Sequence, residues 1–451
     1  MKPKILIFLS LLLGNVSYGQ FETKLDITAL GNIYTGEESP FWIHTNHRGR
    51  VDEETFYSGL ISSEIKFEVS ETESIDFGVG AFYKDGYDDG LKIDEAYFSY
   101  ISKNFGVVLG KKQRADIFQS LSASNENILW SLNSGPLPGV RIFTRSPIFL
   151  NGSHGLGIKL KLEEYLMDDE RYVMEIRLHH KSAHLVFRNQ NNLEISMGLH
   201  QFVQWAGTSP EYGKLPSSFK DYTRVFTGMP GAEDVGGQEV NALGNQLGSY
   251  EISVKTKINN IDFHFLYNHI FEDASGLKMG NLPDGRYVIY FEDNRDTFWG
   301  TDWVKAFIYE FYYTKNQSRS RKSSEVDGAD NYFNNNLYRS GWTYQNSVIG
   351  TPFILKNINR FRIGMNILTV HHLGVKGTAF DKLPYRFLLS YRKNYGLKDS
   401  FYPETRHIFS TLIEVELINA DYNLDVMLGT DVKSYDSSNI GIGIKWSKNI
   451  F

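Results

Sequence analysis

Two segments of the sequence combine aromatic rings with carboxylate, guanidinium and hydroxyl groups, a mixture that suits sugar binding. Aromatic rings stack on the C–H faces of sugars, and polar groups bond to their hydroxyls. Such rings also commonly pack against a wall or lie at a membrane interface, which is the competing interpretation. The predicted carbohydrate-binding residues are Asp296, Trp299, Asp302, Trp303, Tyr338 and Trp342.

Other chemically suggestive residues do not form a recognisable site. In the pairs His179-His180 and His371-His372, neighbouring residues on a strand would point to opposite faces and could not chelate one ion. The acidic turn 85–90 lacks the spacing of a calcium-binding EF-hand and is typical of a hairpin loop. G-x-S-x-G, H-E-x-x-H and Walker-type motifs do not occur. We therefore predict no metal, no cofactor and no enzymatic activity, although rim Ser, His or Asp residues leave a hydrolase open.

Composition excludes several classes of protein. The 451 residues include no cysteine, which excludes disulfides, thiolate metal sites, a cysteine nucleophile and a lipoprotein anchor. The formal net charge of −6 gives no basic footprint for nucleic acid. The mean hydropathy of −0.33 is that of a soluble protein, but an average over alternating residues conceals an apolar surface.

The N-terminus has the layout of a signal peptide. Lys2 and Lys4 precede the apolar run Ile5–Leu13, and small residues precede a cleavage point near Gly19-Gln20. The run is about half as long as the roughly 20 residues of a membrane-spanning helix. We predict that residues 1–19 are a signal peptide and that residues 20–451 form a single domain.

The rest of the chain is dominated by alternation of apolar and polar residues. Tyr250–Ile258 is apolar at most even positions and charged at most odd ones, and Ile61–Val69 repeats the pattern. Roughly 18 such runs occur, including a weak one near Tyr338. A transmembrane barrel turns the apolar face to lipid and the charged face inward, whereas a soluble β protein buries the apolar face in a core. Three features favour an all-β, transmembrane antiparallel β barrel of about 18 strands. The non-lipid face of the strands is heavily charged, Tyr and Trp residues lie at the strand ends, and the predicted signal peptide indicates that the chain is exported.

Four segments interrupt the alternation. Arg114–Pro138, Ser217–Phe226 and Gln238–Leu247 show short helical patterns, and Thr301–Thr314 has apolar residues at i, i+3, i+4 and i+8. A polar loop is expected after it, over Lys315–Asp330. We predict short inserted helices that occlude the lumen of the barrel.

Several ordered motifs carry a family resemblance. The run Asn241–Tyr250 resembles the N-A-x-G-N-x-L-G-S-[YW] segment of the capsule assembly Wzi family. Tyr309–Ser318, Asp330–Trp342 and Ile349–Pro352 follow in the family's order, and Leu132–Val140 is similar to an upstream segment. The resemblance implies an 18-stranded outer-membrane barrel, occluded by helices, that acts as a lectin-like attachment point for capsular polysaccharide without catalysis. It assigns no sugar-contacting residue.

Three functions therefore remain to be distinguished. The leading prediction is an outer-membrane, lectin-like protein that binds capsular polysaccharide or exopolysaccharide and assists capsule assembly. The alternatives are a substrate-selective outer-membrane porin and an outer-membrane hydrolase. The expected partners are the polysaccharide and outer-membrane lipid, with no nucleic acid. The glycan, the strand topology and the oligomeric state stay open.

Overall fold

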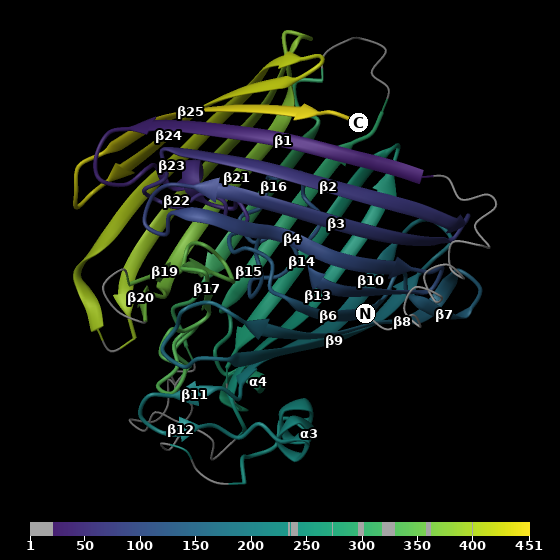
Figure 1. Ribbon diagram of the computed structural model, residues 1–451, viewed down its shortest axis with the longest axis vertical. Coiled ribbons are helices and arrows are strands. Elements are labelled where there is room, and N and C mark those ends of the chain that lie inside the picture. The colour runs from purple at the N-terminus through teal and green to yellow at the C-terminus, as the bar shows by residue number, and fades with distance from the viewer. Residues whose placement is uncertain are drawn as a thin grey trace, which may run out of the picture.

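A closed antiparallel barrel forms the body of the protein (Figure 1). The computed structural model describes residues 21–232, 235, 242–272, 274–295, 302–317, 330–357, 362–398 and 400–451. The predicted signal peptide lies outside the described residues, as does most of the expected loop Lys315–Asp330. Within the described ranges, every helix is too short or too polar to traverse a bilayer.

Nineteen strands make up the barrel sheet, and β6 and β7 occupy one position because both pair with β8. The barrel therefore has the 18 strand positions that the alternation predicts. Its strands are β1 (Phe21–Tyr34), β2 (Tyr57–Ser70), β3 (Glu73–Lys84), β4 (Gly90–Ile101), β5 (Phe105–Lys111), β6 (Gly139–Thr144), β7 (Ile148–Asn151), β8 (His154–Met167), β9 (Ile176–Arg188), β10 (Glu194–Trp205), β13 (Asn245–Ile258), β14 (Ile261–Phe271), β15 (Gly285–Asp293), β16 (Ala306–Tyr313), β21 (Ile367–Ala379), β22 (Leu383–Leu397), β23 (Ser400–Asn419), β24 (Asn423–Lys433) and β25 (Asn439–Asn449).

The smaller elements lie in the connections between these strands. The helices are α2 (Phe41–His44), α3 (Phe219–Thr227) and α4 (Ala274–Leu277). The two-stranded sheets are β11 (Thr208–Ser209) with β12 (Gly213–Lys214), β17 (Thr343–Tyr344) with β18 (Ser347–Val348), and β19 (Leu355–Lys356) with β20 (Ile363–Met365).

The first and last strands close the barrel. Ile27 of β1 pairs with Ile61 of β2, and Asp26 pairs with Asn449 of β25. Closure pairs both sides of the sheet, so that no edge strand is left to recruit another chain.

Alternation decides which side chains face outward. On β3, Phe77 and Val79 are 46% and 61% exposed, whereas the neighbouring Asp76 on the opposite face of the strand is buried in the lumen wall. The same apolar exposure continues on the last strand at Ile442 and Ile444. An exposed apolar band around a closed barrel requires lipid as its solvent. The soluble β protein, in which this face would be covered by a second sheet, is therefore excluded.

The two ends of the barrel differ in the length of their connections. Short turns such as Asn259-Asn260, which adopts positive φ angles, lie at the end where β1 begins and β25 finishes. We call this the short-turn end. The opposite, long-loop end carries residues 35–56 and 112–138 and the described parts of the connections 206–244 and 314–366. In bacterial outer-membrane barrels the short turns face the periplasm and the longer loops face outward.

The predicted helix over Thr301–Thr314 is wrong. Residues Ala306–Tyr313 form β16, which pairs with β15 and β21. Nearly every residue of this strand is apolar or aromatic, so that helical and strand spacing both fit the pattern. Barrel closure selects the strand because its backbone groups must be paired within lipid.

The remaining predictions for interrupted segments had mixed outcomes. Ser217–Phe226 is confirmed as α3, where Ser218 and Asp221 form a capping box and Gly228 ends the helix in the left-handed region. Arg114–Pro138 contains no helix, and the weak strand near Tyr338 is a turn instead. Gln238–Leu247 lies partly outside the described residues, and its described end begins β13.

Candidate functional site

Three chain segments fold back into the lumen and form what we call the plug: residues 40–51, 112–138 and 330–357. Their apolar side chains are buried as a core inside the barrel. Among the described residues, α2 is the helical part of the plug, and the rest is irregular chain with the small hairpin β17–β18 and the short strand β19. The lumen is thus occluded mainly by irregular chain and not by the several short helices that the sequence predicts. Polar side chains such as those of Asn127 and Ser131 form hydrogen bonds with the main chain of the plug. These bonds take the place of the main-chain hydrogen bonds of a helix or sheet.

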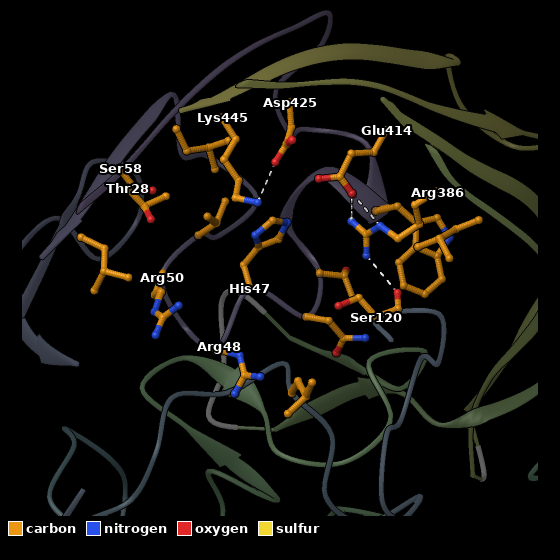
Figure 2. Close-up of a pocket in the computed structure, with 18 of the residues that line it drawn as sticks. Thr28, His47, Arg48, Arg50, Ser58, Ser120, Arg386, Glu414, Asp425 and Lys445 are labelled. Carbon is orange, nitrogen blue, oxygen red and sulfur yellow. Dashed lines mark hydrogen bonds and ion pairs between the residues drawn. The ribbon is translucent and has the colours of Figure 1, made fainter. Parts of the chain in front are cut away.

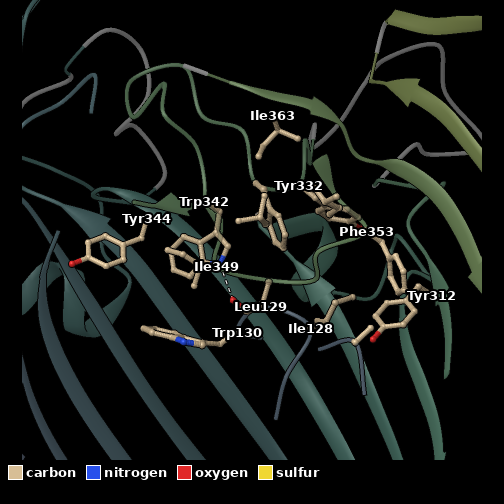
Figure 3. Close-up of a cluster of buried hydrophobic side chains, with 14 of the residues drawn as sticks. Ile128, Leu129, Trp130, Tyr312, Tyr332, Trp342, Tyr344, Ile349, Phe353 and Ile363 are labelled. Carbon is tan, nitrogen blue, oxygen red and sulfur yellow. Dashed lines mark hydrogen bonds between the residues drawn. The ribbon is translucent and has the colours of Figure 1, made fainter. Parts of the chain in front are cut away.

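The centre of the plug is aromatic (Figure 3). Trp342 is completely buried, and its Nε1 donates to the main-chain oxygen of Leu129 at 2.7 Å. Its ring meets Phe202 of the wall edge-on at 5.6 Å. Phe353 stacks on Phe41 at 5.4 Å and so joins the first and third plug segments. These contacts make the plug a packed core rather than a set of loose loops.

A buried ion pair fastens the plug to the wall. Arg286 of β15 and Glu310 of β16 lie 2.6 Å apart, and both side chains have no exposed surface. Glu310 also accepts hydrogen bonds from Ser122 Oγ at 2.7 Å and from the Ala123 amide at 2.8 Å, both in the plug. Arg286 donates in turn to the main-chain oxygen of Asn125 at 2.9 Å. The charges are thus satisfied only when the second plug segment is in place.

A cavity of about 420 Å³ lies in the lumen between the plug and the wall strands β1, β2 and β21–β25 (Figure 2). This volume is within the range of about 300–1,000 Å³ that is usual for small-molecule sites. Lys376 and Asp425 lie near the short-turn ends of their strands, whereas Ser58 lies at the long-loop end of β2. Wall residues from both ends of the strands therefore line the cavity. Its charged lining residues are Arg48, Arg50, Lys376, Arg386, Lys445, Glu414, Glu416 and Asp425.

Most of these charges are held in place by ion pairs. Arg386 bonds to Glu414 at 2.6 Å, and Lys445 bonds to Asp425 at 2.8 Å. Lys376 is exposed to the cavity and has no ion-pair partner among the described residues. The five cations outnumber the three carboxylates, so the lining offers donors to hydroxyl and carboxylate oxygens.

His47 lies in the middle of this cavity (Figure 2). Burial, assisted by the nearby Arg386 guanidinium, lowers the pKa of His47 to about 3. The ring is therefore neutral at physiological pH and offers one donor and one acceptor. A neutral imidazole among fixed charges can bond to a hydroxyl in either direction.

Comparison with known proteins identifies the family. The family model described as capsule assembly protein Wzi matches residues 17–358. The chain belongs to the capsule assembly protein Wzi family. No curated protein matches the sequence.

A solved structure shares the barrel. The Wzi structure from Escherichia coli is 13% identical, covers 98% of this chain and 87% of its own, and superimposes with a TM-score of 0.58. That protein is described as an outer-membrane protein involved in group 1 capsule assembly and as a carbohydrate-binding β-barrel. OccK5 and OccK9 of Pseudomonas aeruginosa are each 8% identical, with TM-scores of 0.49; they cover 96% and 95% of this chain and 99% and 98% of their own. The family and the exposed apolar belt together place the chain in the outer membrane.

The structure divides the six predicted carbohydrate-binding residues of this Wzi family member. Asp296 and Trp299 lie outside the described residues. Asp302 and Trp303 lie at the short-turn end, where Trp303 is 45% exposed and packs edge-on against Phe380. Tyr338 and Trp342 are buried in the plug, 2% and 0% exposed. The structure does not bring these two groups together, and a sugar-binding role for them stays a prediction.

The adjacent histidines behave as strand geometry requires. His180 faces the lumen and bonds to Glu163, whereas His179 faces outward and bonds to Glu164. His372 likewise faces the plug and contacts the main-chain oxygen of Leu121 at 2.8 Å, whereas His371 bonds to Tyr309 outside. The two side chains of each pair therefore point to opposite faces of the strand, as predicted.

Sequence reasoning missed the charges that organise the lumen. Arg286 and Glu310 occupy inward positions of their strands, and the alternation of β15 could have revealed that side. The alternation shows which residues face inward, but it does not show which inward residues pair with each other. That pairing depends on which strands are neighbours and on their register, and the sequence states neither.

We expect the plug to leave little or no open channel. Purified protein in a planar bilayer should pass far less current than an unplugged porin of similar strand number, because aromatic side chains fill the lumen. The measurement is single-channel conductance, with such a porin as the positive control. A steady, porin-sized current through the wild-type barrel would contradict this reading and favour transport.

Proposed function

We propose that this protein binds capsular polysaccharide or exopolysaccharide at the outer membrane and assists capsule assembly by attachment, without catalysis or transport. Its family membership carries the proposal. The plugged lumen supports attachment over a substrate-selective porin, because a transported molecule would have to cross the packed core around Trp342. A hydrolase is not favoured by any described cluster of nucleophile and base.

The luminal cavity is the candidate carbohydrate subsite. Its lining offers fixed guanidinium, ammonium and carboxylate groups together with the hydroxyls of Thr28 and Ser58. Sugar recognition uses such convergent polar groups, and the excess of cations favours polymers that carry carboxylates.

Lys376 is the sharpest probe of this subsite. It lines the cavity and is exposed, and its replacement removes no ion pair among the described residues. Lys257 is the matched control, since this half-exposed lysine lies at the short-turn end of β13, away from the cavity, and pairs only distantly with Asp262 at 3.9 Å.

We expect Lys376→Ala to reduce polysaccharide binding about tenfold, because a charge-assisted hydrogen bond contributes about 1.5–3 kcal/mol. A strain that lacks the protein should shed capsule, and complementation with wild type or Lys257→Ala should restore cell-attached capsule, whereas Lys376→Ala should restore it only partly. The measurement is the ratio of cell-attached to released polysaccharide. Unchanged attachment in the deletion strain would refute the proposed function. Full rescue by Lys376→Ala would refute only the role of the cavity as the carbohydrate subsite.

The aromatic prediction has its own test in the same strain. Among the predicted carbohydrate-binding residues that the structure describes, Trp303 has an exposed ring. Its replacement by alanine therefore removes a ring that could stack on a sugar without emptying a buried core. Its packing against Phe380 and its place near the short-turn rim are equally those of an interfacial aromatic belt.

A further inference from the structure

Three side chains from three adjacent strands converge on the lumen wall away from the cavity. The donor atoms of His184 on β9, His200 on β10 and Glu251 on β13 all lie within 4.8 Å of one another. The strand register explains the meeting: Gly198 of β10 pairs with His184 on one side and with Glu251 on the other. His200 lies two residues further along β10, on the same face.

The spacing of these atoms is close to that of metal ligands. His184 Nε2 lies 3.3 Å from Glu251 Oε1, and His200 Nε2 lies 3.5 Å from Glu251 Oε2. Ligands at about 2.0–2.2 Å from a tetrahedral Zn²⁺ are separated by about 3.3–3.6 Å. The two histidine nitrogens must approach each other somewhat to complete the geometry.

The hydrogen-bond chain behind His200 leaves one nitrogen without a partner. Glu163 accepts from Arg114 at 2.7 Å and from His180 Nδ1 at 2.5 Å, so that His180 carries its proton on Nδ1. A neutral His180 then accepts at Nε2 from His200 Nδ1, 3.2 Å away. His200 is left with a bare Nε2, and this atom is buried without a hydrogen bond and aimed at the Glu251 carboxylate. A cation between these two lone-pair donors would satisfy both.

The surroundings are built to hold these rings. A Cβ at Gly198 would lie 2.0 Å from His184 Cδ2, so that the glycine makes room for the imidazole. Asn268 donates to Glu251 Oε2 at 3.0 Å and orients the carboxylate. The relay through His180 to Glu163 fixes the tautomer of His200, as outer-shell partners do in metal sites. His184 and Glu251 keep 11% and 13% of their side chains exposed, which leaves access from the lumen.

We propose that His184, His200 and Glu251 bind one divalent transition metal ion, with Zn²⁺ as the best fit. Two imidazole nitrogens and one carboxylate are borderline ligands that suit Zn²⁺ rather than the all-oxygen sites of Ca²⁺ and Mg²⁺. The ion ties β9, β10 and β13 together, and the hydrogen bonds through His180 and Glu163 to Arg114 connect it to the plug. The site is independent of polysaccharide binding and of the cavity.

The experiment uses the mature full chain in detergent, with a purification tag that contains no histidine, after removal of metal by chelation. Titration with Co²⁺ should give one ion per chain, with the visible absorption bands of a four-coordinate nitrogen and oxygen site that Zn²⁺ then bleaches. No stoichiometric binding, or a six-coordinate spectrum typical of surface sites, would overturn the proposal. This measurement needs no variant.

Variants locate the ion. His200→Gln and Glu251→Gln should weaken binding at least about a hundredfold, because loss of an outer-shell partner alone costs about 10–100-fold. His372→Gln is the matched control, since that histidine is equally buried and lumen-facing but lies on β21 against the plug. Folding is checked in each case by the shift in electrophoretic mobility on heating. Equal Co²⁺ affinity in wild type and in folded Glu251→Gln would refute the site.

Discussion

Replacing Arg286 by alanine is expected to destabilise the plugged barrel by about 3–5 kcal/mol, because it leaves the Glu310 carboxylate buried and uncompensated. Glu310 has no exposed surface and would keep only the bonds from Ser122, Ala123 and Tyr312. The guanidinium also holds the main-chain oxygen of Asn125, so the second plug segment should loosen with the wall. We therefore expect both a lower unfolding temperature and the appearance of bilayer current.

Lys445→Ala is the control for this variant. Its pair with Asp425 is nearly as short, at 2.8 Å, but the two side chains retain 36% and 11% exposure and face the cavity. Water can solvate the remaining carboxylate, so that the cost should be about 1 kcal/mol or less. Heat-induced loss of the compact electrophoretic band and planar-bilayer conductance give the two measurements. Indistinguishable behaviour of the two variants would show that Arg286–Glu310 does not anchor the plug.

Trp342→Ala is expected to produce the second large effect, about 3–5 kcal/mol, because it empties a fully buried volume at the junction of two plug segments. It also leaves the Leu129 carbonyl without its Nε1 donor and removes the edge contact with Phe202. The third plug segment should then separate from the second. Limited proteolysis of the barrel in detergent should cut within 330–357 in the variant and leave wild type intact.

Two further tryptophan variants separate packing from hydrogen bonding. Trp342→Phe keeps most of the ring volume and loses the hydrogen bond, so it should cost about 1–3 kcal/mol. Trp303→Ala removes a ring that is 45% exposed and should leave the plug resistant to protease. If Trp342→Ala unfolds no earlier than Trp303→Ala, the aromatic centre does not hold the plug together.

The barrel itself was predictable because strand alternation is a local property. The polarity of each residue in Tyr250–Ile258 indicates which face of the strand it occupies, and β13 spans Asn245–Ile258. Closure into 18 positions follows from the number of such runs. The same local rule failed at Ala306–Tyr313, where both faces are mostly apolar and the one charged residue, Glu310, is buried against the plug. There the pattern could not distinguish a strand from a helix.

The carbohydrate site was less accessible to sequence reasoning. Aromatic rings beside polar groups describe both a sugar platform and a packed core, and Trp342 lies in the core. The charges that line the cavity come from plug residues near position 48 and from strands more than 320 residues later in the chain. No local spacing connects Arg48 with Lys376 or Lys445.

The sequence by itself therefore determined the membrane-facing wall, the strand number and the family, because each rests on short patterns that one segment carries alone. Only the tertiary structure decided the plug, the cavity and the meeting of His184, His200 and Glu251. Those features depend on which strands become neighbours, on their register, and on which loops turn back into the lumen. A shift of one residue in register would send His200 to the lipid side, and its own sequence neighbours would not change.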